Sequence, residues 1–139
     1  MGSSDQHPTG GGPGGAVLAA RRQRDFELEF FGRVLARNPS HVDALRQQVE
    51  LLVETGAYDK ALELDQRLAR LAPQDGVVRY NLACTLAMTG QLVQAIDTLA
   101  QAIALGYHDF AHMEADPDLD VLRDLPAYRA LLALRNVAR

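Results

Sequence analysis

Two stretches of this chain superimpose when one of them is shifted by 34 residues. The shift superimposes a proline, a leucine, a glycine and an alanine, which recur as Pro39 and Pro73, Leu52 and Leu86, Gly56 and Gly90, and Ala61 and Ala95. A fixed period of about 20 to 50 residues is typical of an array in which one supersecondary unit is repeated. The period therefore predicts a repeat architecture before any single residue is considered.

The residues around these positions follow one pattern of large, small and helix-breaking side chains. The pattern reads Leu45, Leu52, Tyr58, Ala61, Leu62, Leu68 and Pro73 in the first copy, and Leu82, Ala83, Leu86, Gly90, Leu92, Ala95, Ile96, Leu99 and Ala102 in the second. Over about residues 26–108 the chain thus resembles the tetratricopeptide repeat family. The resemblance implies an all-α fold, a right-handed α-solenoid of antiparallel helix pairs. It implies little about function, because one fold hosts many functions.

The chain divides into a glycine-rich start and one helical domain, residues 16–139. Residues 1–15 lack apolar side chains after Met1, so we expect them to form a flexible tail. The domain is predicted to comprise an N-terminal capping helix (16–38), repeat 1 (42–75), repeat 2 (76–109) and C-terminal capping helices (110–139). Such atypical end units cover the terminal hydrophobic faces of a solenoid.

Within the repeats we expect helices over about 42–55, 58–71, 77–89 and 92–105. Gly56 and Gly90 should end the first helix of each pair, because glycine adopts the left-handed conformation without strain. Beyond Gly106 the sequence predicts two short helical turns split at Pro117. A final helix should begin at Pro126 and carry Tyr128, Leu131, Leu132, Leu134 and Val137.

The composition narrows the classes of partner. A net charge of -4, from 14 basic and 18 acidic residues, disfavours general binding to nucleic acid or to acidic membranes. The single cysteine, Cys84, cannot form an internal disulfide, and no apolar run approaches the length of a membrane span. We therefore expect a cytoplasmic protein whose partner is another protein.

The family resemblance also implies a binding groove, because the first helix of each repeat lines the concave face of these arrays. Carried over in the 34-residue register, it assigns to this groove Asp43, Arg46, Gln47, Glu50, Val53, Glu54, Val77, Tyr80, Asn81, Cys84, Ala87 and Met88. We expect the N-terminal half of the groove to be acidic and its C-terminal half to be mostly apolar. The ligand would be a peptide with a basic end and a short apolar anchor. In an alternative interpretation, Val77, Cys84 and Ala87 pack between adjacent helices.

Some family members clamp the C-terminal carboxylate of a chaperone with Lys, Asn and Arg side chains. Asn81 matches one such position, but Asp43, Arg46 and Glu50 offer at most one cation and two carboxylates that would repel the ligand. A chaperone-tail clamp is therefore disfavoured.

Two patterns near the C-terminus bear on metal binding. His108 and His112 are four residues apart, with Glu114 and Asp116 close by, so a metal-dependent enzyme centred on these histidines is a weaker alternative. Asp116, Asp118 and Asp120 resemble the start of a calcium loop. That loop needs a glycine and a glutamate where Val121 and Ala127 stand, so we interpret the aspartates as helix N-caps.

No serine-centred elbow, phosphate-binding glycine loop or paired catalytic carboxylate occurs in the helical part of the sequence. We therefore expect no enzyme activity and no cofactor. The leading hypothesis is a scaffold or adaptor that holds a peptide segment of a partner in its groove, one version being a chaperone-like assembly factor in a bacterial complex. The alternative is a self-associating module, in which the final helix or the helix carrying Phe26, Phe30 and Phe31 packs against a second copy.

Overall fold

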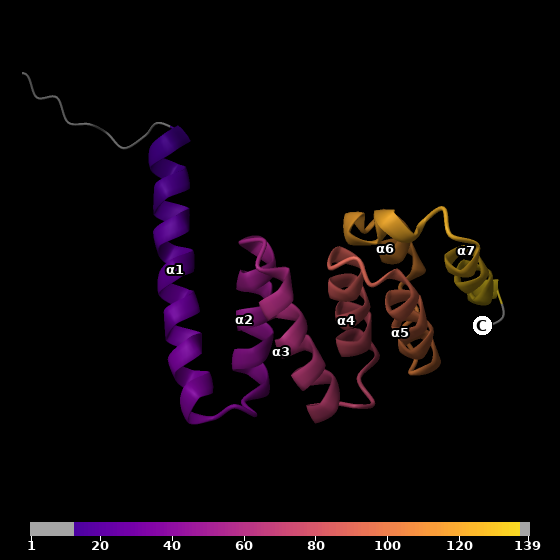
Figure 1. The fold of residues 1–139 in the computed structure, drawn as a ribbon, viewed down its shortest axis with the longest axis horizontal. Helices are drawn as coiled ribbons and strands as arrows, with labels where there is room; N and C mark the ends of the chain where they lie inside the picture. Colours follow the sequence, from indigo (N-terminus) through magenta and orange to yellow (C-terminus); the bar gives the residue numbers. More distant parts are fainter. Residues whose placement is uncertain (1–12, 137–139) are drawn as a thin grey trace, which may run out of the picture.

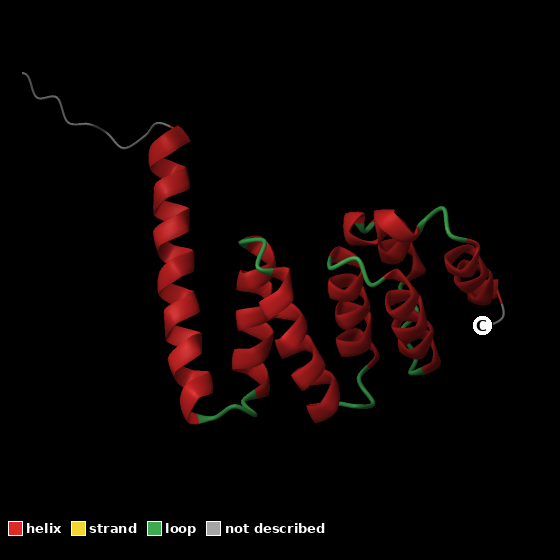
Figure 2. Ribbon diagram, viewed as in Figure 1, coloured by secondary structure: helices red, strands yellow, loops and turns green. Residues whose placement is uncertain are grey.

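The computed structural model describes residues 13–136, which form a row of helices standing side by side (Figure 1). In chain order these are α1 (Pro13–Arg37), α2 (Val42–Glu54), α3 (Tyr58–Leu71), α4 (Gly76–Met88), α5 (Leu92–Ala104), α6 (Phe110–Ala115), the 3₁₀ helix η1 (Pro117–Leu122), α7 (Pro126–Ala133) and the 3₁₀ helix η2 (Leu134–Asn136). Within residues 13–136 only loops join the helices, and no strand occurs (Figure 2). Each helix from α1 to α4 packs on the next one along the chain. The prediction of an all-α solenoid is confirmed.

The helix ends follow from local sequence. Gly56 and Gly90 stand just beyond the ends of α2 and α4 with φ of 79° and 82°, a region that costs other residues about 1–2 kcal/mol. The same backbone hydrogen bond follows each glycine, from Ala57 N–H to the carbonyl of Leu52 and from Gln91 N–H to the carbonyl of Leu86. The four repeat helices accordingly lie within one residue of their predicted bounds.

The recurring alanines explain how closely the helices of one repeat approach. Ala61 on α3 and Ala95 on α5 have no exposed surface, and each lies in the hydrophobic core. A side chain no larger than a methyl group lets the paired backbone come near, and Leu45 and Leu99, which are also fully buried, belong to the same core. Residues that are 34 positions apart in the sequence therefore occupy equivalent places in the core.

Residues 110–136, which form α6, η1, α7 and η2, pack on α4 and α5, and we call this segment the cap. It has the two short turns predicted on either side of Pro117, and its last α-helix begins at Pro126 as predicted. Met113, Leu119 and Leu122 are fully buried, and η1 contacts both α4 and α5. Hydrophobic burial of this kind is the main stabilising term available to such a short segment. Val137, which was predicted to extend the final helix, lies outside the described residues.

The first helix is longer than predicted. It begins at Pro13, so residues 13–15, which were predicted to belong to a flexible tail, are helical, and residues 1–12 lie outside the described part. Proline is tolerated there because the first turn of a helix leaves its backbone N–H groups unpaired. α1 packs on α2 and extends well past it at its N-terminal end (Figure 1). Within residues 13–136, no helix is both long and apolar enough to cross a membrane.

Candidate functional site

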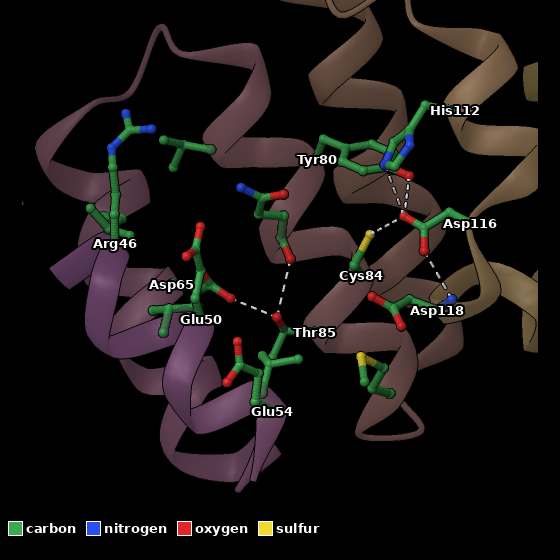
Figure 3. Close-up of a pocket in the computed structure, with 16 residues that line it drawn as sticks. Arg46, Glu50, Glu54, Asp65, Tyr80, Cys84, Thr85, His112, Asp116 and Asp118 are labelled. Carbon is green, nitrogen blue, oxygen red and sulfur yellow. Dashed lines mark hydrogen bonds and ion pairs between the residues drawn. The ribbon is translucent and has the colours of Figure 1, made fainter. Parts of the chain in front are cut away.

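A concavity of about 460 Å³ opens between α2, α3, α4 and the start of the cap (Figure 3). We call it the groove. Residues of four segments line it: Arg46, Val49, Glu50, Val53 and Glu54 of α2; Asp65 and Leu68 of α3; Val78, Tyr80, Asn81, Cys84, Thr85 and Met88 of α4; and His112, Asp116 and Asp118 of the cap. Because neighbouring residues on a helix face are three or four positions apart, α2 and α4 each present one face to this space.

The groove contains eight of the residues that the repeat register predicts: Arg46, Glu50, Val53, Glu54, Tyr80, Asn81, Cys84 and Met88. The other four lie elsewhere. Gln47 lines a second cavity, of about 570 Å³, between α1 and α2. Asp43 and Val77 are exposed, and Ala87 is 2% exposed in the core, as the packing interpretation predicts for it.

The prediction that the C-terminal half of the groove is mostly apolar is wrong. Asp116 and Asp118 line that half together with His112, because the cap folds back against α4. These residues lie beyond Gly106, where the period ends, so the register of the repeat could not place them. Asp65 was also missed, because it belongs to the second helix of its repeat and only first helices were expected to line the groove.

Asp116 is the centre of a polar cluster at the cap end of the groove. Its Oδ2 accepts a hydrogen bond of 2.6 Å from the hydroxyl of Tyr80 and lies 3.4 Å from Nε2 of His112. Its Oδ1 accepts from the backbone N–H of Asp118 at 3.0 Å, which confirms the prediction that Asp116 is a helix N-cap. The Tyr80 ring stacks on Tyr107 with ring centres 4.3 Å apart. These contacts fix the carboxylate in one orientation.

Cys84 lies beside this cluster, with its Sγ 3.7 Å from Oδ2 of Asp116. Burial and the neighbouring Asp116 carboxylate raise the pKa of the Cys84 thiol well above its usual range. A thiol in this environment remains protonated near neutral pH, and the thiolate is the nucleophilic form of cysteine. The geometry thus agrees with a lining role for Cys84 rather than a catalytic one.

Asp65 lies on the floor of the groove and is 1% exposed. Its Oδ2 accepts a hydrogen bond of 2.6 Å from the hydroxyl of Thr85 on α4. Burial raises the pKa of Asp65 to about 6, and the hydrogen bond from Thr85 opposes part of that increase. The carboxyl group therefore connects the two repeats and is still ionised at neutral pH.

Arg46 carries the one guanidinium group in the described lining, and it is directed to the rim. Its Nη2 lies 3.0 Å from Oδ2 of Asp75, the residue that caps α4 through hydrogen bonds from the N–H groups of Val77 and Val78. The ion pair places the positive charge of Arg46 beside a carboxylate outside the lining. The carboxylates within the groove retain their excess negative charge.

The two histidines considered as metal ligands do not share an environment. Nδ1 of His108 lies 3.0 Å from the carbonyl oxygen of Gly106, whereas His112 pairs with Asp116 in the groove. Among the described residues, three potential ligand atoms within 4.8 Å of one another come from Cys84, Asp116 and Asp118. Neither histidine belongs to this set, and Oδ2 of Asp116 already accepts a hydrogen bond from Tyr80, so the geometry does not support the predicted pair of histidine ligands.

Comparisons with known proteins agree with this geometry. The family model described as tetratricopeptide repeat matches residues 52–115, which include α3, α4, α5 and α6. A relative from Arabidopsis thaliana, a protein whose name describes it as chloroplastic, is 26% identical over 120 residues. The alignment covers 84% of this chain but 36% of the relative, so the chain spans about a third of that protein's length.

Proposed function

Because residues 52–115 belong to the tetratricopeptide repeat family, whose domains generally bind other proteins, we propose that this chain is a non-enzymatic scaffold that holds a peptide segment of a partner protein in the groove. The observation that carries the proposal is the shared lining. Both repeats and the C-terminal cap contribute side chains to one concavity. A ligand bound there contacts all of these units at once.

The lining provides the apolar surface and the polar groups that a peptide-binding site needs. Val49, Val53, Leu68 and Met88 offer apolar surface, and Met88 has an unbranched thioether that adapts to different side chains. Polar and charged groups surround these residues and give the site its specificity. A concavity of about 460 Å³ has room for a few side chains. An affinity in the micromolar range, about 8 kcal/mol, is expected of so short a site.

A role in the assembly of a larger complex is one form of this function. A groove that holds an extended segment with micromolar affinity releases it quickly, since most differences in affinity are differences in dissociation rate. Such exchange suits a factor that keeps a subunit available until its final partner takes it.

Peptide selection tests the proposal. We expect the full chain to select binding peptides from a random peptide library, and we expect a Met88→Asp variant to weaken their binding about tenfold or more, measured by fluorescence anisotropy. An apolar contact replaced by a desolvated charge accounts for this loss. The matched control is Val93→Asp, because Val93 is 83% exposed on α5 and lines neither cavity. If Met88→Asp and Val93→Asp bind every selected peptide like the unchanged chain, the groove is not the site.

Self-association is a second candidate function, and exposed aromatic rings on α1 favour it. Phe26 is 65% exposed and Phe30 is 51% exposed, whereas Phe31 packs toward the core. Large exposed aromatic side chains on one helix commonly mark an interface. A second copy could cover them by packing its own α1 alongside, which is the symmetric contact expected of a homodimer.

Light scattering at increasing protein concentration distinguishes this candidate. If α1 mediates self-association, the mean mass rises with concentration and a Phe26→Glu, Phe30→Glu double variant stays at the monomer mass of 15.2 kDa. A mass that stays at this value for the unchanged chain would eliminate the candidate. The peptide-binding proposal is unaffected by either result, because neither phenylalanine lines the groove.

A further inference from the structure

The groove has an excess of negative charge. Five carboxylates line it, those of Glu50, Glu54, Asp65, Asp116 and Asp118, against the guanidinium group of Arg46 and the imidazole ring of His112. Arg46 is paired with Asp75, and His112 lies beside Asp116, so each of these two basic side chains already faces a carboxylate. A concave site lined by one sign of charge concentrates ligands of the opposite sign.

Two of these carboxylates retain oxygens without a partner. Asp65 is 1% exposed, yet among the described residues it accepts one hydrogen bond, at Oδ2 from Thr85. The side chain of Asp118 is half-buried beside Asp116 and accepts none within that part of the chain, although the backbone N–H of Asp118 donates to Asp116. Both carboxylates line the groove, so a donor bound there would add hydrogen bonds that they lack within the described residues.

Asp116 differs from these two because its oxygens are already used. Tyr80, His112 and the N–H of Asp118 all contact it, and the Tyr80 ring is held against Tyr107. Its charge nonetheless remains close to Asp118, whose pKa is raised by burial and by that neighbouring carboxylate. A positive group placed beside Asp118 is attracted by both. The site is rigid before any ligand arrives, which lowers the entropy lost on binding.

On the premise that the proposed function is correct, we propose that the bound segment carries arginine, whose guanidinium group enters the groove and donates to the unpartnered oxygens of Asp65 and Asp118. Guanidinium is planar, presents five N–H donors and is more weakly hydrated than an ammonium group, so it suits partly buried carboxylates better than lysine does. The apolar residues Val53 and Met88, in the same lining, would contact the methylene groups of that side chain or its neighbour.

The test uses the peptides that the full chain selects from the random library. Arginine should be enriched in them, and replacing that arginine by citrulline, which keeps the shape and removes the charge, should weaken binding about tenfold or more. Asp118→Asn and Asp65→Asn should each weaken binding of the arginine peptide. Neither substitution should change binding of the citrulline peptide by much. The matched control is Glu63→Gln, an equal change of charge at a position of α3 outside the groove.

The outcomes separate the two proposals. If the selected peptides bind the Met88→Asp variant as tightly as the unchanged chain, the groove is not the site, and this inference is overturned with it. Peptides that require Met88 but lack arginine, or that bind equally well with citrulline, would leave the groove intact and overturn the inference. An equal loss in Glu63→Gln would also overturn it, by showing a general charge effect. The citrulline comparison is made on the unchanged protein, so it decides the matter even if a variant fails to fold.

Discussion

Replacing Tyr128 by alanine is expected to lower the free energy of unfolding by about 3–5 kcal/mol, the range for deleting a fully buried aromatic ring. Tyr128 lies on α7, is 1% exposed and is the largest of the fully buried side chains in the described residues. Its hydroxyl accepts a hydrogen bond from Arg123, which also donates to the carbonyl oxygens of Met113 and Asp116. Loss of the ring therefore leaves a cavity inside the cap and loosens the arginine that connects its turns.

Urea denaturation followed by far-ultraviolet circular dichroism measures the effect. Two variants serve as controls: Tyr128→Phe, which removes only the hydroxyl and should cost about 1 kcal/mol, and Val121→Ala, at an exposed position, which should cost about 0.5 kcal/mol or less. A loss below about 1 kcal/mol for Tyr128→Ala would show that the cap unfolds separately from the repeats.

The second large effect is a dependence of stability on pH that arises from Asp65. Burial raises the pKa of this carboxyl from 3.8 to about 6 in the folded protein. Between these values the folded state holds a proton that the unfolded state has lost, so the contribution of Asp65 to stability is complete below about pH 3.8 and is lost as pH rises through about 6. A difference of about two in pKa corresponds to about 3 kcal/mol.

An Asp65→Asn variant isolates this contribution, because the other titratable groups are common to both proteins. We expect the unfolding free energy of the unchanged chain, minus that of the variant, to fall by about 3 kcal/mol between about pH 3.5 and about pH 7. The asparagine oxygen can still accept the hydrogen bond from Thr85, so the contact between α3 and α4 is retained. A difference that stays constant over this range would mean that Asp65 has an ordinary pKa in the folded state.

The repeats could be predicted from the sequence because their determinants are local. A glycine that ends each first helix and an alanine at each helix contact recur at one spacing, and each acts within its own helix pair. Together with the rest of the repeat pattern, these positions predict the bounds of the four repeat helices within one residue. The start of α1 was less predictable, since its first turn contains Pro13 and Gly14, and these residue types are equally common in flexible tails.

The candidate site could be predicted only in part. The family resemblance, carried over in the 34-residue register, assigned one face of α2 and of α4 to the groove, which explains why Glu50, Tyr80 and Cys84 were placed there. The contribution of Asp116 depends on how the cap folds back onto α4, a tertiary contact between residues 36 positions apart. One signal was present in the sequence, because a tyrosine on the groove face of α4 needs a partner for its hydroxyl once it is buried.

The central claim is that a partner segment binds across both repeats and the cap, and nuclear magnetic resonance tests it most directly. Backbone amide shifts of the nitrogen-labelled full chain would be recorded with and without a selected peptide. We predict that the shifted amides cluster in α2, α4 and residues 110–122, which carry most of the groove lining. Shifts confined to α1 or α7, with the groove residues unchanged, would contradict the claim.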